Sequence, residues 1–301
     1  MLITPQTRVC EGKKTRYALT AYQPFLWLKT NNDEQYTVIN IDGFIINTDY
    51  RVNGIFKKAE ITTEAVSAIF VPEKIFELLP KNELQVLKKF ADVFGTDIYT
   101  FIWPQDYPTE HNPLDKTIHS AKFSFLNNDI QISSVKKISL NDLERGIKML
   151  RGQSFSKVKP LLSASSNVEC YLANNTFNPW PGDLDAVIFD HAQQKFVALI
   201  EFKTHNGNTP VEDEHIGKYG EQDWRRFSVL FNLADNFKQQ LNYSPKILFI
   251  VWGTNPNNLN HQKIKIDLLD KNIVLKTIFL PRPTYNTFSE TLFETVIELA
   301  K

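Results

Sequence analysis

The sequence contains little cysteine and no long apolar run. Its two cysteines, Cys10 and Cys170, are too few for a disulfide framework or a zinc cluster, and we interpret them as typical of a reducing compartment. The N-terminal stretch lacks the charged-then-apolar pattern of a signal peptide. No apolar run approaches the roughly 18 residues that a membrane span needs. These absences predict a cytoplasmic protein.

Charge of neither sign is in excess, because 34 Lys and Arg residues balance 34 Asp and Glu residues. A globally basic nucleic-acid binder is therefore not indicated, and any basic surface has to be local. Internal repeats and low-complexity segments are also absent from the sequence. What the chain does have is 42% hydrophobic and 23% charged residues over 301 positions, which suits one large globular domain or two ordinary ones.

Residues 1–152 are predicted to form a separate α+β domain, in which we find no chemical motif. The pair Asp42-Gly43 lies between two apolar runs, a pattern typical of a hairpin turn because both turn positions favour positive φ. Asn82 and Gln85 match a capping pair at the start of a helix. We expect this domain to recognise a substrate, to cover a cleft or to form a dimer.

Two local signals mark the end of this first domain. Ser139 or Asn141 should open a helix that runs to about residue 150. Gly152 and the Ser- and Lys-containing stretch up to Lys159 then form the boundary to the second domain.

Residues 153–301 are predicted to form a second domain that starts with a short helix opened by Ser166. Two strands joined by a polar turn are expected over residues 182–190 and 196–203. A long amphipathic helix then leads to a buried strand over residues 246–253. A strand, a helix and a second strand in this order make a crossover unit, so the two strands should be parallel. The rest is predicted to be a hairpin over residues 263–280 and a helix over residues 289–300.

The strand that ends in "ALIEFK" changes from apolar to charged side chains at Glu201. Because side chains on a strand alternate between its two faces, Glu201 and Lys203 share one face. The polar turn predicts a register in which Asp190 faces Phe196, Val187 faces Leu199 and Asp185 faces Glu201. Opposed carboxylates destabilise a sheet, and a divalent cation that takes carboxylate and carbonyl oxygens would explain them. A register slip of two residues would replace Asp185 with Asp183 and leave this conclusion unchanged.

A resemblance to the PD-(D/E)XK nuclease superfamily is carried by Gly182-Asp183-Leu184-Asp185, by the apolar strand that follows, and by Glu201-Phe202-Lys203. The order of helix, strand pair, helix and strand over about residues 160–253 is also similar to the core of that family. The resemblance covers about a third of the chain. It implies a restriction-endonuclease-like fold, an α/β core in a chain that is α+β overall, with a mixed central sheet flanked by helices.

The resemblance also implies roles for individual residues. Asp185 and Glu201 would bind one or two Mg²⁺ ions, for which Mn²⁺ substitutes, with help from the backbone carbonyl of Phe202. Lys203 would position or deprotonate the attacking water and contact the scissile phosphate. A further acidic ligand is expected from the preceding helix, where Glu169 is the candidate. A metal in such a site generates hydroxide near neutral pH and neutralises the charge that develops on the phosphate.

Structural explanations compete with these roles. Asp183 is another candidate ligand, but after Pro181-Gly182 it is equally well explained as a turn former. Glu169 completes the pattern Ser166-x-x-Glu169, so its carboxylate can close a capping box, and we favour this by a small margin. The remaining candidates for substrate contact are His205, Gln222, Arg225 and Arg226, each of which is also explained as a solvated side chain. The charged strand end as a whole can likewise be a solvated fringe.

The leading interpretation is a Mg²⁺-dependent nuclease, a hydrolase of phosphodiester bonds and more specifically an endonuclease, with DNA favoured over RNA. Its partner would be a nucleic acid, and a homodimer is one option for its assembly. The alternative is a non-hydrolytic member of the same fold that binds nucleic acid or a protein. A third interpretation is an unrelated α+β protein in which the motif arose by chance. The presence of both carboxylates and the lysine on one face argues against a pure binding module.

Overall fold

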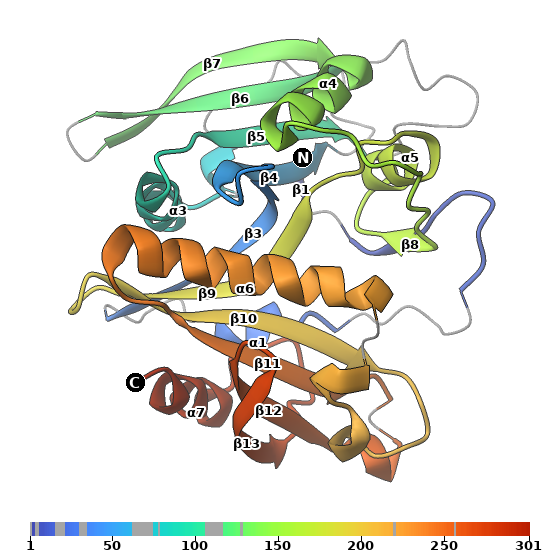
Figure 1. The fold of residues 1–301 in the computed structure, drawn as a ribbon, viewed down its shortest axis with the longest axis vertical. Coiled ribbons are helices and arrows are strands. Elements are labelled where there is room, and N and C mark those ends of the chain that lie inside the picture. Colours follow the sequence, from blue (N-terminus) through green and yellow to red (C-terminus); the bar gives the residue numbers. More distant parts are fainter. Residues whose placement is uncertain are drawn as a thin grey trace. The chain divides into compact units, whose positions relative to one another are not determined.

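The computed structural model contains two compact units, each built from two separated segments of the chain (Figure 1). Unit 1 comprises Met1–Leu19 and Asp42–Gly182, and unit 2 comprises Thr20–Ile41 and Asp183–Lys301. The structure describes residues 2–3, 6–15, 22–29, 35–61, 75–77, 79–105, 117–126, 129–218, 221–255 and 257–301. For residues 2, 3, 117, 126, 129 and 221–226 it describes the backbone only.

The prediction divided the chain at one boundary, after residue 152. In the structure each unit instead combines two separated segments of the chain. Residues 20–41 join unit 2, and residues 153–182 join unit 1. Packing explains both assignments. Trp27 and Val38 lie in the apolar core of unit 2, whereas Val168 lies in the apolar core of unit 1.

Unit 1 is built around a mixed sheet in which the strands follow the order β3-β4-β5-β6-β7, with the short β1 beside β4. Its strands are β1 (Leu2–Ile3), β3 (Tyr36–Ile46), which starts in unit 2, β4 (Val52–Ile61), β5 (Ile98–Pro104), β6 (Thr117–Leu126) and β7 (Asp129–Ser139). β4 and β5 are parallel, and the other described neighbours are antiparallel. The helices are α3 (Lys81–Val93), α4 (Leu140–Arg151) and α5 (Asn167–Asn175). A separate small sheet pairs β2 (Arg8–Val9) with β8 (Ser163–Ala164).

Local capping signals explain one helix start in unit 1 and fail at another. At the start of α4, the Ser139 side chain accepts a hydrogen bond from the Asp142 amide and Asp142 completes a capping box, so the prediction for Ser139 is confirmed. Gly152 follows the helix with a left-handed φ of 81°. The predicted cap at Asn82 is wrong, because α3 starts directly behind Pro80 and has no side-chain cap.

The predicted hairpin turn at Asp42-Gly43 is wrong, because both residues lie inside the continuous strand β3. The turn comes later, where the side chain of Asn47 accepts hydrogen bonds of 3.0 Å from two amides that follow it. Tertiary contacts outweigh the local signal. Asp42 forms an ion pair of 2.9 Å with Lys57 on the next strand, and a Cβ at Gly43 would lie 3.0 Å from the Trp180 indole nitrogen. Gly43 therefore allows a close approach and not a turn.

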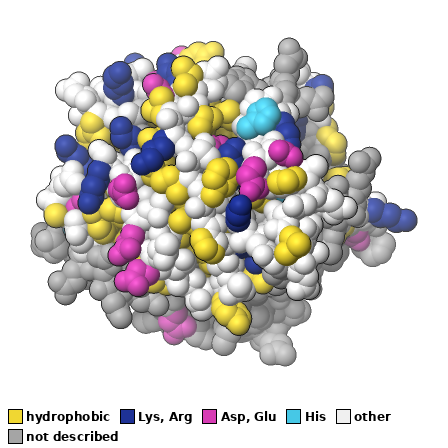
Figure 2. Space-filling model, turned by 90° about the horizontal axis from the view of Figure 1, so that it is seen from below, with side chains coloured by type: hydrophobic (Ala, Val, Ile, Leu, Met, Phe, Trp, Pro, Cys, Tyr) yellow, Lys and Arg dark blue, Asp and Glu magenta, His cyan; other side chains and the backbone are white. Residues whose placement is uncertain are grey.

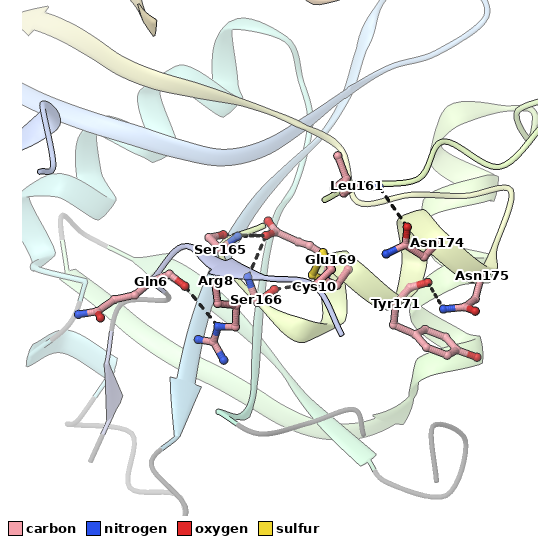
Figure 3. The surroundings of a disulfide bond; sticks show 11 residues. Gln6, Arg8, Cys10, Leu161, Ser165, Ser166, Glu169, Tyr171, Asn174 and Asn175 are labelled. Atoms are coloured by element: carbon pink, nitrogen blue, oxygen red, sulfur yellow. Dashed lines mark hydrogen bonds between the residues drawn. A yellow bond between two sulfur atoms is a disulfide. The ribbon is translucent and has the colours of Figure 1, made fainter. Parts of the chain in front are cut away.

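A disulfide joins Cys10 to Cys170 and ties the N-terminal segment of unit 1 to α5 (Figure 3). The two residues are 160 positions apart in the sequence. Disulfides are rare in cytosolic proteins, where thiols are kept reduced. The cysteine pair therefore does not support the reducing compartment that the low cysteine content suggested.

Unit 2 contains the strand order β13-β12-β11-β10-β9, with β3 beside β9. Its strands are β9 (Gly182–Asp190), β10 (Lys195–His205), β11 (Lys246–Gly253), β12 (Lys263–Asp270) and β13 (Ile273–Pro281). Its helices are α1 (Phe25–Leu28), α6 (Glu221–Leu241) and α7 (Glu290–Ala300), with short 3₁₀ turns η2 (Val211–Asp213), η3 (Ile216–Lys218) and η4 (Leu259–His261). β10 and β11, which precede and follow α6 in the sequence, are neighbouring parallel strands. This confirms the predicted crossover unit. The late hairpin and the closing helix are confirmed as well.

Different helices cover the two faces of the unit 2 sheet. On one face, Ile200 of β10 joins the apolar core that includes residues of α1 and α7. On the other face, α6 lies lengthwise along β9 and β10 (Figure 1). The ring of Phe237 lies 5.5 Å from that of Phe196, and the ring of Phe227 lies 5.3 Å from that of Phe249. The helix therefore runs antiparallel to β10, with its first half nearer the end of that strand.

The described part of the chain is α+β, with mixed sheets flanked by helices, and this part of the predicted fold class is confirmed. None of the described helices combines the length and the apolar composition that crossing a bilayer requires. On the face drawn in Figure 2, acidic, basic and apolar side chains are interspersed without a large area of one charge sign. This face agrees with the balanced charge of the sequence.

Candidate functional site

The turn between β9 and β10 is one residue shorter than predicted. Asp190 pairs with Lys195 and not with Phe196. Its carboxylate accepts hydrogen bonds of 2.8 and 3.0 Å from two amides of the turn, which closes it tightly. An irregularity between Phe196 and Ala198 then takes up one extra residue in β10 and shifts the pairing to the predicted register.

Beyond that irregularity the pairing of the two strands agrees with the prediction. Val187 faces Leu199, and the ladder ends one residue further on. The next step of the same register places Asp185 beside Glu201. The two carboxylates thus occupy adjoining positions on neighbouring strands.

Strand alternation assigns Asp185, Glu201 and Lys203 to the α6 face of the sheet. Ile200 and Ile188 point into the apolar core on the opposite face, so alternation turns their neighbours toward α6. Asp183 shares this face with Asp185 but is exposed at the start of β9.

A direct hydrogen bond joins the two strands at the point where the ladder ends. Asp185 accepts it through Oδ2 from the backbone N–H of Phe202 at 2.6 Å. The N–H and C=O groups of one strand residue point to the same side of the strand. The carbonyl of Phe202 therefore points toward β9, the side from which Asp185 approaches. Two carboxylates and one carbonyl oxygen are thereby arranged around the end of the strand pair.

Burial differs between the two charged residues that share this face of β10. Glu201 is only 4% exposed, whereas Lys203 is partly exposed. Glu201 pairs with Phe249 of β11, the residue against which Phe227 of α6 packs. The six helical residues before Phe227 extend α6 by about 9 Å toward the end of β10. Lys203, two residues beyond Glu201 on β10, is partly exposed, and His205, two residues further on, is buried again.

The backbone of the first turns of α6 contains Gln222, Arg225 and Arg226. The side chains of these three residues lie outside the described part of the structure. Their predicted contacts with substrate stay predictions.

Glu169 closes the capping box of α5, as one of its two interpretations predicted. Its Oε2 accepts hydrogen bonds from the amides of Ser165 and Ser166 at 2.9 and 3.1 Å, and from the Ser165 hydroxyl at 2.7 Å (Figure 3). Its Oε1 forms an ion pair with Lys58 of β4. Both oxygens therefore have protein partners within unit 1, which makes the capping role the better supported one.

His205 is buried at the end of β10, so its interpretation as a solvated side chain is wrong. Its Nδ1 lies 3.0 Å from Glu214 Oε2, and its Nε2 lies 2.7 Å from the carbonyl oxygen of Thr209. The chain between β10 and α6 folds back and supplies both partners. His205 therefore holds this connection in place.

A second acid–lysine pair lies on the same face of the sheet, two strands away from β10. Lys265 and Asp267 of β12 are both buried and form an ion pair of 3.0 Å. Lys265 pairs with Val251 of β11, which pairs on its other side with Lys203. Asp267 pairs with Phe249, which pairs on its other side with Glu201. Lys265 also donates a hydrogen bond of 2.5 Å to the carbonyl of Glu214. The sequence interpretation missed this pair, although the alternation in "KIKID" signalled three charged side chains, Lys263, Lys265 and Asp267, on one face of the strand.

The donor set around Asp185 suits a hard divalent cation, because Mg²⁺ is held by one or two carboxylates together with other oxygen ligands. Among the described residues there is no cluster of three or more His, Cys, Asp or Glu side chains that could hold a metal ion. The candidate set needs no such cluster, since it consists of Asp185, Glu201 and the Phe202 carbonyl. The residues present therefore fit the proposed ion.

Neither protein-family models nor curated proteins match the chain. Among solved structures, one described as a sex pheromone staph-cAM373 precursor is 10% identical over 93% of this chain and 85% of its own, with a TM-score of 0.21. Another, a sex pheromone precursor from Lactobacillus salivarius subsp. salivarius UCC118, is 12% identical over 86% of this chain and 71% of its own, with a TM-score of 0.15. At such TM-scores the similarity supports no conclusion about fold or function.

Proposed function

We propose that the chain is a metal-dependent nuclease that hydrolyses phosphodiester bonds, with its centre at the end of the β9–β10 pair. The observation that carries this proposal is the placement of Asp185, Glu201 and Lys203 at adjoining positions on one face of the sheet. The hydrogen bond of 2.6 Å from the Phe202 amide to Asp185 supports it by fixing one carboxylate beside the other strand. A restriction-endonuclease-like core is part of the same proposal.

In this centre Asp185, Glu201 and the Phe202 carbonyl would hold Mg²⁺ or Mn²⁺. When bound, such an ion lowers the pKa of a coordinated water and stabilises negative charge on the phosphate. Burial of Glu201 keeps bulk water away from its carboxylate and strengthens its attraction to a cation. Asp183, exposed on the same face, is the candidate for an additional ligand.

Lys203 acts on the phosphate and on the attacking water in this proposal. Its ammonium group is a compact point charge with three hydrogen-bond donors, which suits one phosphate oxygen and one water at the same time. Its partial exposure lets a large substrate reach it from solvent. His205 supports the neighbouring connection through Glu214 and Thr209 and takes no part in the chemistry.

The substrate is proposed to be DNA in preference to RNA, cut internally, and unit 1 is proposed to contribute to its recognition or to dimer formation. A cytoplasmic location stays a prediction, and the Cys10–Cys170 disulfide is more typical of an oxidising compartment. Mass determination of the native protein with and without alkylation of free thiols tests that point directly.

The test of the proposed function is incubation with plasmid, linear duplex and single-stranded DNA in Mg²⁺, Mn²⁺ or EDTA. We expect cleavage with either metal and none in EDTA. Glu201→Gln should lower the rate on the order of 10²-fold or more, because a group that stabilises charge in the transition state is removed. Glu294→Gln, at an exposed position on α7, is the matched control. Mn²⁺ binding measured by calorimetry, together with DNA binding but no cleavage, would favour the non-hydrolytic alternative.

A further inference from the structure

A second charged feature lies in unit 1, outside the proposed centre. Between Glu144 and Glu169 the chain carries five Lys or Arg residues and no Asp or Glu. This stretch covers the end of α4 and the connection to α5. Such a stretch can provide a local basic surface even in a chain of balanced charge.

Two of these cations converge on one aromatic ring. The guanidinium of Arg151 lies 4.6 Å and the ammonium of Lys159 lies 3.6 Å from the centre of the Phe155 ring. Their charges are therefore no more than about 8 Å apart. The ring is held by a hydrogen bond of 3.0 Å from the Phe155 amide to the carbonyl of Phe177, whose side chain is 50% exposed.

Arg151 lacks a carboxylate partner among the described residues. Its Nη2 donates a hydrogen bond of 3.1 Å to the carbonyl of Pro179, and its Nη1 makes no hydrogen bond within the described structure. Burial lowers the pKa of Arg151 to about 10, so the side chain is still charged at neutral pH. Glu144, two turns earlier on α4, is occupied by a hydrogen bond of 3.1 Å from the Asn178 side chain.

A partly buried guanidinium without a carboxylate partner among the described residues is costly unless an anion compensates its charge. We infer that Arg151, Phe155 and Lys159 form a phosphate-binding surface on unit 1 that takes the sugar-phosphate backbone of a nucleic acid. The choice of nucleic acid as the polyanion rests on the proposed function. The spacing of the two cations fits a strand that presents one phosphate for about every 3.4 Å of axial rise.

The test is a titration of a fluorescent DNA duplex by anisotropy in EDTA, over a series of salt concentrations. Arg151→Gln and Lys159→Gln should each weaken binding several-fold and lower the slope of log K against log salt by about 0.9 for each phosphate that the protein no longer neutralises. Arg151→Lys should keep most of the salt slope, because the charge remains. Arg145→Gln is the matched control, since Arg145 stands on the same helix but is already paired with Asp142.

The controls separate the possible outcomes. Melting temperatures identify a variant that fails to fold, and the partly exposed Lys159 provides a second variant if Arg151→Gln does so. Parental affinity and salt slope in both glutamine variants would overturn the inference, as would binding to anionic lipid vesicles in place of the duplex. Binding is measured in EDTA, where metal-dependent cleavage does not occur. A protein whose binding depends on Arg151 but that cleaves no DNA in Mg²⁺ or Mn²⁺ would overturn only the proposed function. A protein that cleaves but binds equally well without these cations would overturn only the inference.

Discussion

Buried charge is arranged differently in the two units. In unit 1 three buried acids, on β3, β4 and α5, each have a cation beside them. The pairs are Asp42–Lys57, Glu60–Arg8 and Glu169–Lys58. In unit 2, Asp185 accepts a hydrogen bond from a backbone amide, and Glu201 and Lys203 follow one another along the same face of one strand. Unit 1 thus contains closed ion pairs between separate elements, whereas on β10 of unit 2 a buried carboxylate and a partly exposed lysine share one face of one strand.

This difference distinguishes charges that hold a fold from charges that can meet a ligand. Both members of the Asp42–Lys57 and Glu169–Lys58 pairs are largely shielded from solvent, with side chains no more than 10% exposed. Burial raises the pKa of Glu60 even though Arg8 opposes the shift, because burial disfavours the charged carboxylate. At the end of β10, exposure increases from Glu201 to Lys203, so a substrate could approach without breaking an existing core.

The largest expected effect concerns Lys203. Lys203→Ala should lower the cleavage rate by about 10²–10⁴-fold, the usual contribution of a positioned acid–base group. The free energy of unfolding should change by only about 0–1 kcal/mol, as for a charge at a solvent-accessible position. Lys203→Arg should not restore the rate, because guanidinium is wider, forked and effectively never deprotonated. Single-turnover cleavage, Mn²⁺ affinity and melting temperature measure the three quantities.

The control for this experiment is Lys195→Arg, at the exposed start of the same strand. It should cleave at the parental rate. If Lys203→Arg does so too, Lys203 acts only as a positive charge and the role proposed for it is wrong.

A contrast between Glu169 and Glu201 tests the comparison of the two units directly. Glu169→Ala should lower the free energy of unfolding by about 3–5 kcal/mol, because it leaves the buried ammonium of Lys58 without its partner. Glu169→Gln should be milder, since glutamine can still close the capping box. Glu201→Ala should leave stability in the absence of metal unchanged or raised, because it relieves the repulsion with Asp185.

Chemical denaturation in EDTA provides these measurements. Equal losses of stability for Glu169→Ala and Glu201→Ala would mean that both carboxylates are structural, and the distinction between the units would fail. Loss of Mn²⁺ binding in both Glu169 variants at parental stability would instead restore Glu169 as a ligand.

Removal of the disulfide should affect unit 1 alone. Cys10→Ala with Cys170→Ala avoids burying a new hydroxyl group and should cost about 2–4 kcal/mol of stability. Hydrogen exchange followed by mass spectrometry should show faster exchange in α5 and β2, and unchanged exchange in β10 and β11. Reduction of the parent protein should reproduce the pattern. Equal acceleration in both units would show that they unfold as one.

The smallest effect concerns pH. Burial lowers the pKa of His119 below its ordinary value of 6.5, and Lys137 adds to this shift. The unfolded chain therefore takes up the proton more readily than the folded one as pH falls through that range. The resulting stability is fully present above pH 6.5 and is lost as pH decreases toward the lower pKa of the folded state. Unfolding free energies at about pH 7.5 and about pH 5.5 should differ less in His119→Gln than in the parent. Identical differences in the two proteins would assign the pH dependence to other groups.

Signals that act over a few residues predicted the structure well. The Ser139 cap, the Ser166–Glu169 capping box and the parallel pair on either side of α6 all depend on short spacings or on simple periodicity. The shared face of Asp185 and Glu201 was predictable because a strand has a period of two, even though the turn was misplaced by one residue. The assignment of these side chains to one face therefore did not depend on the exact length of the turn.

Long-range contacts could not be predicted from these signals. Asp42-Gly43 has the sequence of a turn, but the ion pair with Lys57 and the close approach of Trp180 keep it in a strand. No local pattern shows that residues 20–41 join a sheet made mainly of residues after 182, or that Lys265 reaches the carbonyl of Glu214. Such contacts depend on which surfaces meet, and that information is spread over the whole sequence.

The disulfide has a consequence for how breakage of the chain would be detected. It makes residues 10–170 a covalently closed ring, and two of the three passages between the units, after residues 19 and 41, lie within that ring. A protease that cuts once inside the ring would open it without releasing a fragment. Such nicked molecules would migrate as intact chains on a non-reducing gel and separate into two pieces only after reduction. A single cut after residue 182 lies outside the ring, so the fragments 1–182 and 183–301 would separate on the same gel without reduction.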